Sequence, residues 1–174
     1  DRGLTVTSLP LLHRVPCCGF LFREKPSLPH IKREMIDFYK IPHYAINSIK
    51  QGANWTTPEG DIIPNNRLVF AGDAPRSYAY CSDTAYNPSL CETLKGVNLL
   101  YHEATFAEDM AERARLVGHS TARQAAQIAR AAEVGKLLLG HFSARYEDET
   151  VLLQEAQMVF PNAILAHEGL CISL

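Results

Sequence analysis

Val97-Asn-Leu-Leu-Tyr-His-Glu103 and Lys136-Leu-Leu-Leu-Gly-His141 are short apolar runs that each end on ionisable side chains. Residues 121–134, between them, have the pattern of a helix: Thr121 and Gln124 form a Thr-x-x-Gln capping box, and alanines follow. Strands and helices that alternate in this way predict an α/β layered fold. In such a sheet, polar residues that follow buried strands lie at the carboxyl edge, where α/β proteins place their chemistry.

The composition is that of one ordinary globular domain and excludes several classes of protein. The chain has 174 residues, 47% apolar residues and a net charge of −2, so it has no basic footprint for nucleic acid. No apolar stretch approaches a membrane span, and no signal peptide is recognisable. The chain opens on Asp1 rather than Met, and we expect an upstream segment to precede it. The five cysteines form no Cys-x-x-Cys motif, which argues against a disulfide framework and favours a reducing compartment.

Turn residues interrupt the pattern between residues 26 and 73. We expect strands at 5–12 and 17–22, then a short amphipathic helix at 31–39. From residue 41 to 73 prolines, glycines and asparagines recur, which predicts an inserted excursion with small hairpins rather than core. The remaining expected elements are strands at 77–81, 97–101, 136–139, 163–166 and 170–174 and helices at 88–95, 106–117 and 147–159.

Acids and histidines follow several of these strands. Asp83 could bridge two metal ions with its two carboxylate oxygens, although local sequence alone favours a turn aspartate. His141 is placed as a zinc ligand or as a hydrogen-bonded histidine at a strand end. His13 lies between two strand-like runs, where a structural histidine is the commoner outcome.

His119 stands just before a predicted helix N-terminus, with Ser120 and Thr121. Free N–H groups there favour an anion, and a histidine beside them could hold a phosphate and pass a proton to a leaving oxygen. The alternative is a helix cap beside a solvated histidine. Glu103 could orient His119 or cap the next helix, and Arg145 could bind phosphate or pair with neighbouring acids.

The motifs His-Glu-Ala-Thr at 102–105, His-Ser-Thr at 119–121 and Gly-His-Phe-Ser-Ala-Arg-Tyr at 140–146 resemble consecutive signatures of ribonuclease Z, a tRNA 3′-end processing endonuclease. Leu12-His13-Arg-Val-Pro-Cys-Cys-Gly-Phe and Cys-Ser-Asp83-Thr are similar to two further motifs of that family. The resemblance runs in order from about residue 11 to the C-terminus.

This resemblance implies an α/β fold, the C-terminal part of a metallo-β-lactamase αβ/βα sandwich formed by residues 1–174 with a tRNA-binding arm inserted at 26–73. It implies two zinc ions, with His13 ligating one, His141 the other and Asp83 bridging both. Other divalent ions could replace zinc. His119 would be the proton donor and Glu103 its partner.

The same resemblance implies cleavage of the 3′ trailer from precursor tRNA by a cytoplasmic homodimer without a membrane anchor. Substrate contacts would come from the arm and from the edge of the sheet. The residues assigned to them are Lys32, Arg33, Lys50, Ser120, Thr121 and Arg145.

No His-x-His-x-Asp-His cluster occurs in the chain, although the family uses one for most remaining zinc ligands. We therefore expect these residues alone to bind zinc poorly, to leave RNA uncut and to need the missing N-terminal half. The family's Gly-Pro arm pattern is replaced here by His43-Tyr44-Ala45. Two alternatives are another phosphodiesterase or hydrolase of the same fold and a metal-free half that serves as a binding module.

Overall fold

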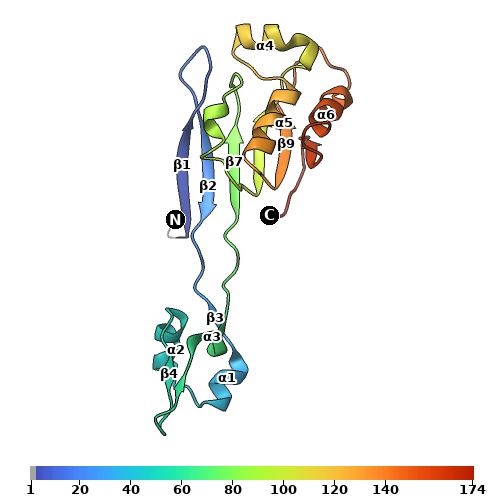
Figure 1. Cartoon of the computed structure of the whole chain (residues 1–174). Coiled ribbons are helices and arrows are strands. Elements are labelled where there is room, and N and C mark those ends of the chain that lie inside the picture. Colours follow the sequence, from blue (N-terminus) through green and yellow to red (C-terminus); the bar gives the residue numbers. More distant parts are fainter. Residues whose placement is uncertain (1–2) are drawn as a thin grey trace. The chain divides into compact units, whose positions relative to one another are not determined.

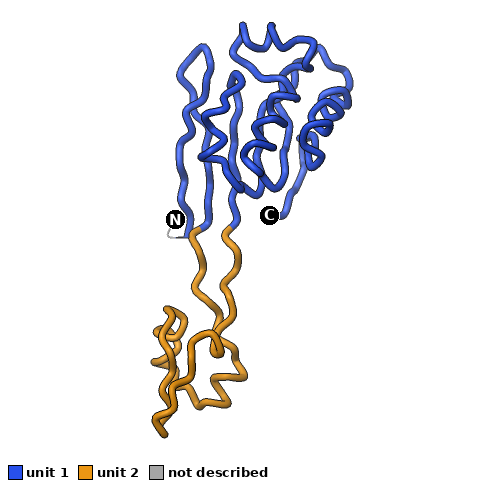
Figure 2. Tube along the Cα trace, viewed as in Figure 1, with its two compact units in different colours: residues 1–24, 76–174 blue, residues 25–75 orange. Residues whose placement is uncertain are grey.

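The computed structural model describes residues 3–174 and divides the chain into two compact units (Figure 2). The first unit comprises the described residues up to Glu24 together with Arg76–Leu174, and the second comprises Lys25–Pro75. The second unit is thus inserted into the sequence of the first. The expected excursion at 26–73 falls within it.

A six-stranded mixed sheet forms the centre of the first unit (Figure 1). Its order is β1-β2-β7-β8-β9-β10; β1 pairs antiparallel with β2 and β2 with β7, whereas the ladders from β7 to β10 are parallel. The strands are β1 (Leu4–Pro10), β2 (Cys18–Glu24), β7 (Ser77–Cys81), β8 (Leu99–Glu103), β9 (Lys136–Gly140) and β10 (Ala163–Leu165). The parallel part contains the strands whose ends carry the predicted site.

Helices connect the parallel strands. They are η1 (Pro88–Leu90), η2 (Glu108–Met110), α4 (Ala111–Val117), α5 (Ala122–Ala131) and α6 (Thr150–Gln157). Two of them, α5 and α6, pack against the sheet. The capping box predicted for α5 is present, because Thr121 accepts from the Gln124 N–H and Gln124 accepts from the Thr121 N–H. Buried alanines on α5 let it approach the strands closely. They join one hydrophobic cluster with Leu100, Leu137 and Leu139.

Alternate residues of the strands point to the other face of the sheet, which carries aromatic side chains. Phe20 pairs with Tyr80 in the ladder and Tyr80 with Tyr101, and the two tyrosine rings stack 4.7 Å apart. Phe20 and Tyr80 are 41% and 40% exposed. The strands thus expose aromatic surface opposite the helices.

The chain leaves the first unit at Glu24 and returns to it at Arg76, and these two residues are bonded to each other. The Glu24 N–H donates to the Arg76 carbonyl at 2.9 Å, and the Arg76 guanidinium lies 2.5 Å from the Glu24 carboxylate. Hydrogen bonds from Arg76 lower the pKa of Glu24 to about 2. The carboxylate is therefore charged at neutral pH, and the two ends of the insertion are held together.

The second unit has a small core of its own. Its elements are β3 (His30–Ile31), α1 (Arg33–Phe38), α2 (His43–Lys50), β4 (Trp55–Thr56), β5 (Ile62–Ile63), α3 (Asn65–Leu68) and β6 (Val69–Phe70). β3 pairs with β6 and β4 with β5, both antiparallel. Ile41, Ala45, Ile49, Ile63 and Leu68 are buried together.

Several expectations for individual elements were wrong. Residues 41–73 contain the helix α2 and this buried cluster, not hairpins alone, because the apolar side chains of α2 recur at helical spacing. The strand expected at 170–174 is absent; Ile172 and Leu174 instead line a hollow with Phe22 and Tyr78. The helix expected at 106–117 begins as the 3₁₀ turn η2 and becomes α-helical only at Ala111. Among residues 3–174 no helix is both long and apolar enough to cross a membrane.

Candidate functional site

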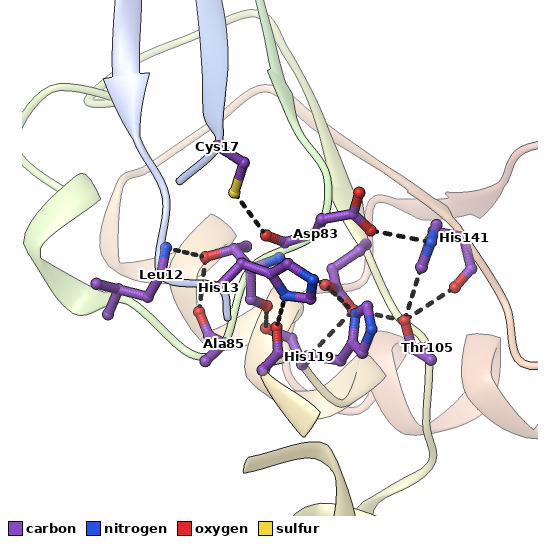
Figure 3. Close-up of polar contacts among 12 residues, drawn as sticks. Leu12, His13, Cys17, Asp83, Ala85, Thr105, His119 and His141 are labelled. Carbon is purple, nitrogen blue, oxygen red and sulfur yellow. Dashed lines mark hydrogen bonds and ion pairs between the residues drawn. The ribbon is translucent and has the colours of Figure 1, made fainter. Parts of the chain in front are cut away.

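The candidate site lies at the carboxyl edge of the three parallel strands β7, β8 and β9 (Figure 3). Glu103 is the last residue of β8, His141 directly follows β9, and Asp83 lies two residues beyond the end of β7. Asp83 and His141 both have left-handed backbone, each with φ of 58°. This conformation costs a non-glycine residue about 1–2 kcal/mol, so the fold holds both side chains at a local energetic cost.

Four side chains in the described part of the chain form a group that could hold a metal ion. Each of Asp83, Glu103, His119 and His141 offers a ligand atom, and these atoms all lie within 4.8 Å of one another. Asp83 Oδ1 is 3.0 Å from His141 Nε2, and the two side chains are 47% and 40% exposed. A carboxylate oxygen beside an imidazole nitrogen, both reachable from solvent, suits a divalent ion such as zinc or manganese.

Glu103 is fully buried and accepts four hydrogen bonds from the chain. Its Oε1 accepts from the Thr84 N–H at 2.7 Å and lies 2.8 Å from His119 Nδ1. Its Oε2 accepts from the Ser120 N–H at 3.0 Å and from the Thr105 hydroxyl at 2.6 Å. Buried carboxylates require such compensation, so Glu103 acts here as a fixed acceptor that ties the loop after β7 and the residues before α5 to the end of β8.

His119 is oriented by this carboxylate. Because a carboxylate only accepts, Nδ1 carries the proton in the His119–Glu103 contact, and Nε2 is the nitrogen left for chemistry. The imidazole ring lies 5.2 Å from the ring of His141 and 5.0 Å from that of His13, centroid to centroid. The structure thus gathers three of the predicted histidines.

His13 is held near the site but is not a member of the four-residue group. Its Nδ1 is 2.8 Å from the carbonyl of Gly118, which ends α4 with a left-handed φ of 81°. A Cβ atom on Gly118 would lie 2.9 Å from that nitrogen, so glycine is needed there for both conformation and space. The preceding residue, Leu12, is tied to the Asp83 loop through the Thr84 hydroxyl and the Ala85 N–H.

The residues predicted to contact substrate are distributed differently. Ser120 and Thr121 are fully buried; the Ser120 hydroxyl donates to the Thr84 carbonyl and that of Thr121 to Glu108. The guanidinium of Arg145 lies 5.2 Å from the Phe106 ring and donates to the Ser143 hydroxyl. Lys32, Arg33 and Lys50 belong to the second unit, where Lys32 precedes α1 and Lys50 ends α2. Substrate contact by all six stays a prediction.

Two threonines at the site were missed by the sequence reasoning. Thr84 and Thr105 both contact Glu103, and each follows one of the predicted acids by one or two residues. That spacing beyond a strand end was the signal that could have identified them. The neighbouring His102 is fully buried; its Nδ1 lies 2.7 Å from the Glu103 carbonyl, and burial lowers its pKa. It is therefore a neutral, packed histidine.

A cavity of about 320 Å³ adjoins the site on one side. His119 forms part of its wall, with Tyr86, Gln124 and Arg115. The Arg115 guanidinium is paired with Glu112 at 2.7 Å, so its charge is balanced locally. Space for a ligand therefore exists directly beside His119.

Comparison with curated proteins identifies relatives over the whole chain. The chain is 60% identical to ribonuclease Z of Bacteroides fragilis (strain YCH46), 56% identical to that of Parabacteroides distasonis (strain ATCC 8503) and 48% identical to that of Porphyromonas gingivalis (strain ATCC BAA-308 / W83), in each case over 174 residues. These matches cover all of this chain but 57% of each relative. The chain thus spans little more than half the length of the relatives. No protein-family profile matches it.

Solved structures show the same fold at low sequence identity. The metallo-β-lactamase fold protein YhfI from Bacillus subtilis superposes with a TM-score of 0.62 at 20% identity, over 97% of this chain and 49% of that one. Human tRNase Z, short form, superposes with a TM-score of 0.59 at 22% identity, over 99% and 44% of the two chains. By sequence, then, the chain is a relative of ribonuclease Z along its whole length, and its α/β fold is that of part of the metallo-β-lactamase proteins.

Proposed function

We propose that this chain is part of a metal-dependent endoribonuclease that removes the 3′ trailer from precursor tRNA. The observation that carries the proposal is the meeting of Asp83, Glu103, His119 and His141 at one sheet edge, in a chain 60% identical to a ribonuclease Z. Phosphodiester hydrolysis needs stabilisation of negative charge on the phosphate and a proton for the leaving oxygen. The four residues can supply both.

Asp83 and His141 would hold the ion, with His13 as a further ligand, and two zinc ions in the complete site are part of the proposal. A divalent cation bound there supplies Lewis-acid stabilisation of charge on phosphate oxygens. The exposed Asp83–His141 pair suits this role better than Glu103, whose oxygens are already engaged by four donors.

His119 would act on the RNA itself. Glu103 stabilises the protonated imidazole through Nδ1, so that Nε2 can hold a proton against the phosphate and release it to the departing 3′ oxygen. The cavity beside His119 would receive the nucleotide next to the cleaved bond. Because Glu112 neutralises Arg115 in the wall of this cavity, the cavity suits a base better than a second phosphate.

Precursor cleavage by the complete protein, compared with residues 1–174 alone, tests the proposal. We expect trailer removal by the complete protein and none by the 174-residue chain, because three ligands spread over two ions do not make a closed site. Two tight zinc sites on the 174-residue chain would contradict the reason given for its inactivity. A complete protein that hydrolyses bis-p-nitrophenyl phosphate but no precursor tRNA would contradict the expectation of trailer removal. A cytoplasmic location belongs to the same proposal and is supported by the five free cysteines, which fit a reducing compartment. A homodimer of the complete protein is also part of it.

Replacing Lys32, Arg33 and Lys50 together by alanine should weaken tRNA binding without changing the site. Each lost phosphate contact should lower the slope of log affinity against log salt concentration by about 1. Fluorescence anisotropy of labelled tRNA at several salt concentrations measures that slope. The matched control replaces Lys95, Arg113 and Arg130, which are exposed basic residues of the first unit. Equal effects of the two triple variants would mean that Lys32, Arg33 and Lys50 have no special part in tRNA binding.

A further inference from the structure

The hydroxyl of Thr105 lies between the buried carboxylate and the second histidine of the site. Its Oγ1 is 2.6 Å from Glu103 Oε2, 2.9 Å from His141 Nδ1 and 3.0 Å from the His141 carbonyl oxygen. Thr105 is 7% exposed and Glu103 is fully buried, so the hydroxyl and the carboxylate are shielded from solvent. One hydroxyl thus has three partners and a single proton to share among them.

The three contacts determine where the protons lie. The carbonyl oxygen only accepts, and Glu103 acts as an acceptor on both oxygens, because each also receives a backbone N–H. The hydroxyl proton therefore points to one of these oxygens, and Oγ1 must accept the contact from His141. Nδ1 of His141 then carries a hydrogen, and in the neutral imidazole Nε2 is left with a lone pair.

That lone pair faces Asp83. His141 Nε2 and Asp83 Oδ1 are 3.0 Å apart, and an unprotonated nitrogen beside a carboxylate oxygen leaves two electron pairs facing each other. Such a pair is stabilised by a cation that both can share. In the opposite tautomer Nε2 carries the hydrogen and donates it to Asp83. The electron pair of Nε2 is then not available to bind an ion.

We propose that Thr105 is a positioning residue that fixes His141 in the Nδ1–H tautomer and thereby prepares Nε2 to bind a metal ion. Glu103 then sets the proton pattern of both histidines, of His119 by direct contact and of His141 through the threonine hydroxyl. The inference rests on the proposed function only for the ion that His141 receives. The tautomer is a property of the metal-free protein.

Replacement of Thr105 by valine removes the hydroxyl and keeps the shape of the side chain. The surrounding backbone contacts do not depend on it: the Ser143 N–H donates to the Thr105 carbonyl at 3.1 Å and the Ala104 N–H to the Gly140 carbonyl at 2.8 Å. Thr105→Ser restores the hydroxyl. Thr84→Val is the matched control, because Thr84 is fully buried at the same site and its hydroxyl contacts only the backbone of Leu12 and Ala85.

The test is ¹⁵N NMR of the histidine rings in the complete, metal-free protein, with the His141 signals assigned by their loss in His141→Gln. We expect the Nδ1–H pattern for His141 in the parent, in Thr105→Ser and in Thr84→Val. In Thr105→Val the Nε2–H form should appear, and zinc affinity measured by chelator competition should fall about 10- to 100-fold. Backbone amide spectra check that each variant is folded.

An Nε2–H tautomer in the parent would overturn the proposal without any variant, and so would an unchanged His141 pattern in Thr105→Val. Failure of Thr105→Ser to retain the parent pattern would also overturn it, because the hydroxyl would then not be the cause. Neither readout involves RNA. Cleavage of precursor tRNA by the metal-loaded parent therefore tests the proposed function separately.

Discussion

Glu103→Gln in the complete protein is expected to slow trailer removal roughly 100- to 10,000-fold, the range for loss of a positioned proton-transfer group. It should also lower the free energy of unfolding by about 1–3 kcal/mol. Each carboxylate oxygen faces one backbone N–H, from Thr84 or Ser120, and one side-chain donor. Whichever way the glutamine amide lies, its NH₂ group meets a backbone N–H that cannot turn away. In one of the two orientations His119 also loses the acceptor that orients it, and in both it loses the negative charge beside Nδ1.

Single-turnover cleavage and thermal unfolding of the same preparation measure the two effects. Glu155→Gln is the matched control, because Glu155 is half-buried and accepts one hydrogen bond, from the Glu108 N–H at 2.9 Å. It should behave like the parent in both measurements. If Glu103→Gln kept the cleavage rate and the melting temperature of the parent, Glu103 would be needed neither for cleavage nor for stability.

Asp83→Gly and His141→Gly should separate metal binding from stability. Each removes a proposed ligand, and a loss of at least about 100-fold in zinc affinity is expected, since even outer partners of a metal ligand contribute 10- to 100-fold. Both positions have φ of 58°, which glycine adopts freely and alanine does not. Each glycine variant should therefore be more stable than the alanine variant at the same position by about 1 kcal/mol.

Chelator competition for the affinity and thermal unfolding in excess chelator for the stability provide the comparison. Glu133 serves as the control, because it has φ of 52° and belongs to the turn between α5 and β9. Glu133→Gly should also be more stable than Glu133→Ala, with zinc affinity unchanged. If alanine proved as stable as glycine at Asp83 and His141, the backbone there would not be strained in solution.

The parallel half of the fold was predictable because its signals are local. The strands β7, β8 and β9 are short apolar runs, and the polar residues after them share one edge wherever such strands are parallel. The approach of Asp83 to His141 follows from that rule. The contacts of the Thr105 hydroxyl with Glu103 and His141 do not, because hydrogen bonds between loops depend on distances of tenths of an ångström.

The insertion and the C-terminus were harder to predict for a different physical reason. Pro42 and Gly52 flank α2 and suggested turns, although Ala45 and Ile49 have the spacing of one helical face. The residues after β10 are apolar enough for a strand, but a strand also needs a neighbour with free backbone groups. Local sequence does not identify that neighbour, and the ladder of β10 is with β9.

The bonded pair Glu24 and Arg76 makes the second unit an exchangeable cassette. β2 and β7 are antiparallel neighbours, with Arg23 opposite Ser77, so a tight turn in place of residues 25–75 would convert them into a simple hairpin. The residues of the site all lie outside that cassette. Selection could therefore lengthen, replace or delete residues 25–75 and leave the arrangement of Asp83, Glu103, His119 and His141 unchanged.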